Sequence, residues 1–600
     1  MPAWPPAPWI PVDAVAAAVA APPRRRRLRI AGATLATLAI LVVPTGGYLY
    51  LHLARGTGDV LVDRAIPASV AAYATIRLDP SLGTKQHIRD LVNRFPASRG
   101  DAGSVVSRAV DGVLAGSGLT YDRDVSPWLG TQVAMIGTVS ATESGGALLV
   151  VDTDDARAAA TMRAAESGPG GRGLTWSDQT VDGVGVRTGS CPGSCAQAWS
   201  WAVVDHLVVL GSASTVGDVI QTDHGHQPAL GAQQQYRDTA AQLPGDRVAE
   251  VYVAARPLLD ALHRSLAGTD SATRAVVEKM VAPLDAYRSA GLAVSVQSDR
   301  ADLDMVTLTD PARQPAPGPG GTELASWLPA STVVLGAGST QSSSSGAGAL
   351  AVIGLLSVVG TRTDAGTFQN IPNGLPIPSG SGTNPTPAPV PTARPSAQAV
   401  PGATVTDPLD PGSLARGLGI DPADLSHLTG PVAAGMWPVA GGPPRGALLI
   451  RADDSAALGR MLDAVLSSLA PGALKQAPII EGSATIVSLG ASAPAYAIVG
   501  GVGIVGSSVN AVRDVIDTHD GRPPVTDTSA YRGSGAPAAE DGVVFADVQT
   551  MVAMIRSWLP AADRSGYDGA AAGVAPLRTV TAASSGDRSV QRVRIEVVVG

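Results

Sequence analysis

GALLVVDTDDARAAATM, residues 146–162, returns 300 positions later as GALLIRADDSAALGRML, residues 446–462. Each copy begins with a short apolar run of the kind that forms a strand, and aspartates that can cap a helix follow it. In the second copy the apolar residues recur at helical spacing, which predicts an amphipathic helix. They are Leu458, Met461, Leu462, Val465, Leu466 and Leu469. The doubled segment indicates that one strand-and-helix design occurs twice in this chain.

The repeat extends well beyond this segment. YDRDVSPWLG at residues 121–130 faces DPADLSHLTG at 421–430, and VLGSASTVGDVIQTDHG at 209–225 faces IVGSSVNAVRDVIDTHDG at 504–521. Solenoid units run only about 20 to 50 residues, so a repeat of this length predicts a duplicated domain.

The first copy closes on two paired strands. GLAVSVQSDRADLDMVTL, residues 291–308, reads as two alternating runs joined by a polar turn, which is typical of a hairpin. Hairpins mixed with single helices favour an α+β fold, in which helices cover a largely antiparallel sheet. The expected fold class is α+β, with an N-terminal transmembrane helix followed by two tandem homologous modules of this kind. We expect the modules at 60–312 and 323–600, a linker at 313–322, and a disordered Pro, Thr, Ser and Gly-rich insert at 361–412.

An apolar segment near the amino terminus predicts the membrane anchor. Residues 30–54 carry no formal charge, and at 1.5 Å per residue a helix of this length spans a hydrocarbon core of ~30 Å. Arginines cluster before the segment and only Arg55 follows it closely, so the positive-inside rule places the amino terminus in the cytoplasm. We therefore expect a single-pass protein of the cell membrane with its bulk outside the cytoplasm. A cleaved export signal is the alternative, although no small-x-small cleavage site follows the segment.

The charge distribution disfavours nucleic acid as a partner. Residues 1–29, a Pro and Arg-rich tail that we expect to be disordered, hold five arginines and one aspartate, a net charge of +4. The rest of the 600-residue chain holds 38 basic and 50 acidic residues, a net charge of −12. An acidic surface repels polyanions, so we expect the partners to be the cytoplasmic membrane, through residues 30–54, and envelope proteins or lipids.

Two motifs carry a family resemblance. IPASVAAYATIRLDPSLGTKQHIRDLVNRFP at residues 66–96, followed by YDRDVSPWLG, resembles an uncharacterised family of single-pass exported proteins of high-GC bacteria, known only as a domain of unknown function. Its members open with LPAD, LDPS and QK motifs and continue with KDVxPWLG. The matching residues are Pro67, Ala68, Tyr73, Leu78, Asp79, Pro80, Ser81, Lys85, Asp124, Val125, Pro127, Trp128, Leu129 and Gly130. Ser69 replaces the acidic residue of LPAD, and Lys85 precedes Gln86, reversing the QK order. The resemblance implies an exported, anchored protein and brings no activity.

The only two cysteines lie in the first module, in CPGSC at Cys191 and Cys195. Outside the cytoplasm such a pair favours a structural disulfide across a tight turn. The alternative is a metal or redox site formed with a distant histidine, for which His206, His224 and His226 are the candidates.

The other candidate site residues, paired aspartates and four tryptophans, also have structural explanations. Asp154 and Asp155 are echoed by Asp453 and Asp454, and we favour helix capping over a carboxylate dyad. Four tryptophans can line a groove, although aromatic residues in strand-like runs usually belong to a core. They are Trp128, Trp176, Trp199 and Trp201. The sequence contains no G-x-S-x-G, P-loop, S-x-x-K or H-E-x-x-H motif.

These observations favour a membrane-anchored extracytoplasmic protein that acts as a non-catalytic binding or scaffolding module of the cell envelope, with no catalytic residues and no cofactor. Two alternatives stay open. One is an exported redox or metal-binding enzyme that uses Cys191 and Cys195, and the other is a carrier of lipid or peptide.

Overall fold

The computed structural model describes most of the chain from residue 62 onward. The described residues are 62–95, 111, 118–139, 144–168, 171, 173–191, 199–266, 274, 278, 282–314, 321–339, 420–421, 423–428, 430–469, 475–482, 484–490, 493–562 and 564–600. The chain divides into two compact units, Met1–Arg313 with Val599–Gly600 and Gln314–Val598, which we call unit 1 and unit 2.

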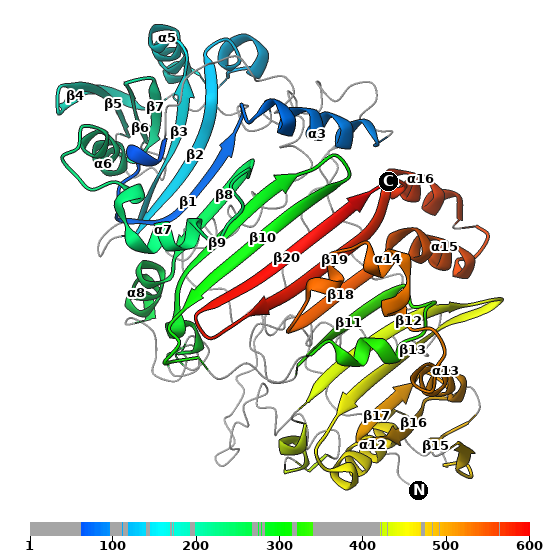
Figure 1. Cartoon of the computed structure of the whole chain (residues 1–600). Helices are drawn as coiled ribbons and strands as arrows, with labels where there is room; N and C mark the ends of the chain where they lie inside the picture. Colours follow the sequence, from blue (N-terminus) through cyan, green and yellow to red (C-terminus); the bar gives the residue numbers. More distant parts are fainter. Residues whose placement is uncertain are drawn as a thin grey trace, which may run out of the picture. The chain divides into compact units, whose positions relative to one another are not determined.

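The described part of the chain contains ten strands from residues 70–309 and ten from residues 334–599 (Figure 1). The first set is β1 (Val70–Arg77), β2 (Leu129–Val139), β3 (Ser144–Asp152), β4 (Thr175–Val181), β5 (Val184–Ser190), β6 (Trp199–Val204), β7 (Leu207–Gly211), β8 (Ala249–Ala254), β9 (Tyr287–Val296) and β10 (Arg300–Thr309). The second is β11 (Val334–Ser339), β12 (Pro431–Val439), β13 (Gly442–Arg451), β14 (Ile479–Glu481), β15 (Ala484–Ser488), β16 (Ala495–Val499), β17 (Val502–Gly506), β18 (Gly542–Asp547), β19 (Leu577–Gly586) and β20 (Val590–Val599).

Helices follow several of these strands. Those of unit 1 are α3 (Leu82–Asn93), α5 (Asp155–Glu166), α6 (Ala213–Asp223), α7 (Gln234–Ala240) and α8 (Ala255–Leu266). Those of unit 2 are α12 (Ser455–Leu469), α13 (Val509–His519), α14 (Ser529–Arg532), α15 (Val548–Trp558) and α16 (Arg564–Val574). Short helical turns are η2 (Val62–Arg64), η4 (Tyr121–Val125), η5 (Leu230–Ala232), η6 (Ala282–Ala286), η7 (Glu323–Trp327), η9 (Asp424–His427), η10 (Val525–Asp527) and η11 (Ala536–Ala538).

The two units use one strand order. In unit 1 the order is β4-β5-β6-β7-β3-β2-β1-β8-β9-β10, by antiparallel pairings throughout. In unit 2 it is β14-β15-β16-β17-β13-β12-β11-β18-β19-β20. Position by position, the second order repeats the first, so each strand of one unit has a counterpart in the other.

Helices pack on both faces of each sheet. Successive strand residues point to opposite faces, so Val209 lies in the core under α6 while its neighbour Val208 lies in a separate cluster under α5. In unit 2 Ile504 packs with α13 and Val505 packs with α12. The α5 face of unit 1 and the α12 face of unit 2 are therefore equivalent surfaces.

Several local predictions are confirmed. The apolar spacing that begins at Leu458 lies on α12, and the expected hairpin is β9 and β10. Asp154 caps α5 by accepting a hydrogen bond from the Arg157 amide at 3.0 Å. Asp454 accepts one from the Ala457 amide at 3.1 Å, so capping is the observed role of these two aspartates.

The predicted fold class, an α+β chain with an N-terminal transmembrane helix and two separate sheet-and-helix modules, is wrong. The described strands number 20 and are assembled by antiparallel pairing into a large sheet architecture on which the helices pack. Among the described residues no helix is both long and apolar enough to cross a membrane. The local strand-then-helix pattern was misleading because many strands pair with segments far away in the chain, as β1 does with β8 and β3 with β7.

The predicted domain boundaries stay predictions. The tail at 1–29, the apolar segment at 30–54 and the insert at 361–412 lie outside the described residues.

Gly211 at the end of β7 supplies a stability prediction. A Cβ on Gly211 would press against the backbone oxygen of Gly146 and lie 2.7 Å from Ala147 Cα, and backbone atoms of a paired strand cannot move aside cheaply. We expect Gly211→Ala to lower the free energy of unfolding by roughly 1–3 kcal/mol, measured by denaturant titration followed by circular dichroism.

Gly217→Ala is the matched control for Gly211→Ala. Gly217 lies inside α6, where the nearest atom to a new Cβ is Val181 Cγ1 at 4.0 Å. Alanine favours a helix interior by up to ~1 kcal/mol over glycine, so this variant should be neutral or more stable. Equal effects of the two substitutions would contradict the close approach at Gly211.

Candidate functional site

Several polar side chains of unit 1 lie on the face of the sheet that carries α5. The segment DVSPWLG at 124–130 supports this helix: Trp128 is buried, and its indole donates hydrogen bonds to the Asp124 carbonyl at 2.6 Å and to Thr161 Oγ1 at 3.1 Å. Since Thr161 lies on α5, Trp128 ties the helix to the start of β2. Of the four candidate groove tryptophans, Trp128 is therefore a core residue.

A pocket of about 480 Å³ opens between α5 and strands β4 to β6, and we call it the α5 pocket. Its lining side chains carry both signs of charge and one large aromatic ring. The lining residues are Ala159, Arg163, Glu166, Asp178, Gly185, Arg187, Trp201 and Val203. Trp201 borders this pocket, but it is as buried as Trp128 and belongs to the same core cluster.

Glu166 and Arg187 form the centre of the α5 pocket. The Arg187 guanidinium donates two hydrogen bonds to the Glu166 carboxylate, at 3.0 and 2.6 Å, and pairs with Asp178 at 3.1 Å. The Trp201 indole donates to the same Glu166 carboxylate at 3.0 Å. The hydrogen bond to Glu166 raises the pKa of Arg187 further above its usual range, with Asp178 adding to the rise.

Two more tryptophans flank this network. The Arg187 guanidinium lies 5.8 Å from the ring centre of Trp176, within cation–π range, and Trp176 packs edge-on against Trp199 at 4.7 Å. Arg187 is thus held by Glu166, Asp178 and Trp176, so its side chain is pre-organised.

Unit 2 carries different residues at the equivalent positions. Arg187 pairs with Trp201 across β5 and β6, and in the same register Val487 pairs with Tyr496 across β15 and β16. The counterpart of Glu166, 300 positions on, is Leu466, which packs in one cluster with Tyr496 and Val487. Tyr496 also donates a hydrogen bond to Asp463 at 2.6 Å, and Asp463 pairs with Lys475 at 2.6 Å, so unit 2 has a polar network of its own here. The Glu166–Arg187 pair is particular to unit 1.

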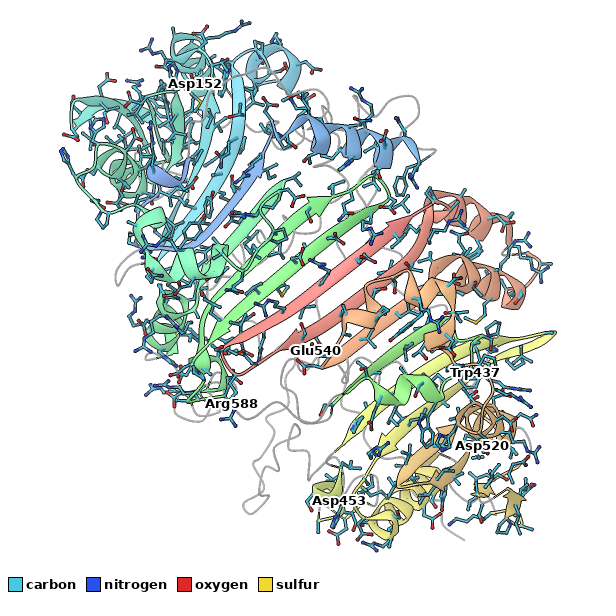
Figure 2. All side chains as sticks on the ribbon, viewed as in Figure 1. Asp152, Trp437, Asp453, Asp520, Glu540 and Arg588 are labelled. Carbon is cyan, nitrogen blue, oxygen red and sulfur yellow. The ribbon has the colours of Figure 1, made fainter. Side chains whose placement is uncertain are left out.

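A second polar group, which we call the Asp152 cluster, consists of Asp152, Asp155 and His206. They come from the end of β3, the first residue of α5 and the turn between β6 and β7. His206 Nδ1 lies 2.9 Å from Asp155 Oδ1 and 3.6 Å from Asp152 Oδ1. Figure 2 labels Asp152 at the base of α5. The predicted site residue His206 is thus placed beside two carboxylates.

Burial dominates the electrostatics of the Asp152 cluster. The Asp152 side chain is 0% exposed, and neither of its carboxylate oxygens has a hydrogen-bond partner among the described residues. Burial raises the pKa of Asp152 to about 7, and the neighbouring Asp155 adds to the rise, while His206 opposes it.

The other two predicted histidines meet a different carboxylate. His224 Nδ1 and His226 Nδ1 lie 2.6 and 2.9 Å from Asp182 Oδ2, in the turn between β4 and β5. Asp223 lies beside His224, and burial raises the pKa of Asp223. His224 and His226 are therefore together, and the Asp182 carboxylate joins them.

Cys191 lies directly after β5, at the opposite end of that strand from Asp182. A strand of this length at about 3.3 Å per residue separates the two ends by roughly 20 Å. The structure accordingly does not bring Cys191 to the histidines, and Cys195 lies outside the described residues. The disulfide, and the metal or redox site that uses these cysteines, stay predictions.

The sequence reading missed Asp152, Glu166 and Arg187, although the repeat held a signal for each of them. The offset of 300 sets Asp152 against Ala452 and Glu166 against Leu466. Likewise, the turn residues Asp205 and His206 stand where the second copy has two glycines. An acid that faces an apolar residue in an otherwise similar repeat marks a position that the fold does not require to be charged.

The fold and this site define the class as an antiparallel sheet protein with a pre-organised polar pocket under one helix. Residues 34–347 match the family model described as Protein of unknown function (DUF3352), and the chain belongs to this family. The expectation of an uncharacterised family is thereby confirmed. Among curated proteins, none matches the chain.

Solved structures of TP0453 are similar to part of the chain. Crystal form III covers 42% of this chain and 81% of that chain at 8% identity and a TM-score of 0.21. Crystal form I covers 42% and 80%, also at 8% identity and a TM-score of 0.21.

The buried Asp152 carboxyl predicts a pH-dependent stability. Its folded pKa of about 7 lies above the unfolded value of about 3.9, so the folded chain binds this proton more tightly. The stabilisation is complete below the unfolded pKa and is lost as the pH rises through 7. Asp152→Ala, which installs the residue of position 452, should therefore raise the melting temperature at pH 8 by about 2–10 °C, and by less at pH 5. Differential scanning calorimetry in chelating buffer measures this, and a difference that does not change with pH contradicts it.

Proposed function

We propose that the protein is a non-catalytic binding module of the cell envelope, tethered to the cytoplasmic membrane by residues 30–54. Unit 1 carries the binding site, and the α5 pocket takes a small ligand with an anionic group. Unit 2 repeats the scaffold without this pocket chemistry.

The observation that carries the proposal is the charged network at Glu166, Arg187 and Trp201, where unit 2 has Leu466, Val487 and Tyr496. A partly buried ion pair is rarely more stabilising than apolar residues of similar volume. Unit 2 shows that apolar residues fit this backbone. The charges of unit 1 are therefore better explained by recognition than by stability.

The expected charge of the ligand follows from which charged side chains of the pocket are already paired. Arg187 is shared by Glu166 and Asp178, so these three side chains leave no free positive charge. Arg163 also lines the pocket, and no carboxylate of the described chain lies within ion-pair distance of it. A ligand carboxylate or phosphate would pair with the Arg163 guanidinium through charge-assisted hydrogen bonds.

A binding role also fits the residue types in the α5 pocket. The eight lining residues include no serine, cysteine or histidine, and both carboxylates are bound to Arg187. A nucleophile with an adjacent base, which covalent catalysis needs, is therefore not assembled from these side chains.

Arg163→Ala tests the ligand site. We expect at least one member of a panel of small carboxylates and organic phosphates to change tryptophan fluorescence on titration. The variant should weaken that binding about tenfold or more, the value of one lost charge-assisted hydrogen bond. Arg157→Ala is the matched control, because Arg157 is an exposed arginine of α5 that does not line the pocket.

A second variant separates recognition from folding. Glu166→Leu with Arg187→Val copies unit 2 at both positions, and it should abolish binding while the melting temperature holds or rises. Binding that survives in this variant, or equal losses in Arg163→Ala and Arg157→Ala, contradicts the assignment of the α5 pocket.

The tether is tested by protease treatment of intact spheroplasts. With residues 30–54 as an anchor and the bulk outside the cytoplasm, an epitope after Gly600 should be digested before lysis, while one before Met1 should survive until lysis. Protection of the carboxyl-terminal epitope in intact spheroplasts rules out this topology, whatever the α5 pocket binds.

A further inference from the structure

The Asp152 cluster brings together three side chains that the proposed ligand site does not use. One donor atom each from Asp152, Asp155 and His206 lies within 4.8 Å of the other two. Two carboxylates and one imidazole from three separate elements thus converge at the amino-terminal end of α5.

The buried carboxyl of Asp152 is the member of this cluster that lacks a hydrogen-bond partner within the described part of the chain. Its side chain is 0% exposed, and both oxygens lack a hydrogen-bond partner among the described residues. A buried charge without a partner is expensive, so such groups are normally paired or coordinate a metal. The His206 imidazole Nδ1 lies 3.6 Å from Asp152 Oδ1, beyond hydrogen-bond distance.

The backbone that holds His206 is unfavourable for its residue type. Asp205 and His206 have φ angles of 44° and 64°, the left-handed region that glycine tolerates best. At the same turn unit 2 has Gly500 and Gly501, with φ angles of 54° and 79°. Unit 1 therefore keeps a histidine where glycine is less strained, and strain of this kind concentrates at functional sites.

Unit 2 shows that the fold does not need the three side chains. The Asp152 amide donates to the His206 carbonyl at 2.9 Å, and the Ala452 amide donates to the Gly501 carbonyl at 3.1 Å. The first residue of α5 is Asp155, and that of α12 is Ser455. One backbone geometry thus carries Asp, Asp and His in unit 1, and Ala, Ser and Gly in unit 2.

We propose that Asp152, Asp155 and His206 bind one divalent transition metal ion, with Zn²⁺ as the best-matched probe. An imidazole nitrogen favours Zn²⁺ and similar ions over Mg²⁺ and Ca²⁺, which prefer sites built only from oxygen. The ion would pair the buried Asp152 carboxylate on the inner side. His206 is 59% exposed and Asp155 49% exposed, so the outer side is open to water or to a further ligand.

The test is a Zn²⁺ titration of the full chain, purified without a polyhistidine tag and stripped with a chelator, against a chromophoric competitor. We expect one ion per chain and weaker binding of Mg²⁺ and Ca²⁺. Asp152→Ala and His206→Gly, each the residue of unit 2, should weaken Zn²⁺ binding by at least ~100-fold, because even outer-shell losses cost up to that much.

His226→Ala is the matched control, since His226 is another exposed histidine of unit 1 with an aspartate partner. It should leave Zn²⁺ binding unchanged. Loss of binding in His226→Ala with retention in His206→Gly would move the metal to Asp182 and overturn the proposal. So would the failure of the unaltered chain to bind Zn²⁺.

Transferring the three residues to unit 2 gives the converse test, because it looks for a gain of Zn²⁺ binding and not for a loss. Ala452→Asp, Ser455→Asp and Gly501→His together rebuild the cluster on unit 2, and the stoichiometry should rise from one Zn²⁺ to two. A folded variant that still binds one ion shows that these three residues are not sufficient and contradicts the proposal. The α5 pocket is independent of this result, because Arg163→Ala should bind Zn²⁺ normally.

Discussion

The antiparallel pairing of β3 with both β2 and β7 is the constraint on which the described sites depend. It places the end of β3 beside the turn between β6 and β7, so Asp152 meets His206 although 54 positions separate them. It also places the first turn of α5 at the same end of β3. In unit 2 the pairing of β13 with β12 and β17 does the same for Ala452 and Gly501. Main-chain hydrogen bonds are indifferent to side chains, so one backbone accommodates two different sets of residues.

Because main-chain pairing does not depend on the side chains, the two units share a strand order but carry different side chains at equivalent positions. The α12 face is packed with apolar side chains such as Leu462, Leu466 and Tyr496, and this burial stabilises unit 2. On the α5 face, the Glu166–Arg187 pair and the Asp152 carboxyl take the place of some of these apolar side chains. Polar groups in such positions cost stability unless they are satisfied. Unit 2 is thus an internal reference, and the differences in unit 1 identify polar positions that the shared scaffold does not require.

Local patterns in the sequence predicted local structure well. The spacing from Leu458 predicted α12, the alternating runs of 291–308 predicted the hairpin of β9 and β10, and Asp154 was expected to cap a helix. The fold class was wrong because strand order depends on pairings between distant segments, which periodicity does not encode. The candidate site was found only in part. His206 was identified as a possible ligand, but it was grouped with Cys191, which lies at the other end of the strands. Asp152 and Arg187 belong to no chemical motif, and only the comparison with the second copy of the repeat distinguishes them in the sequence.

The sequence by itself determined the positions of many strands and helices, the repeat, the charge balance and membership of an uncharacterised family, because these depend on residue type and spacing along the chain. Only the tertiary structure decided which side chains meet. Glu166 reaches Arg187 and Trp201 because α5 folds back over β5 and β6, and Asp152 reaches His206 because β3 pairs with β7. The pairing of distant strands is selected by the burial of a whole sheet face, a collective property of many residues. For that reason no short stretch of the sequence could reveal it.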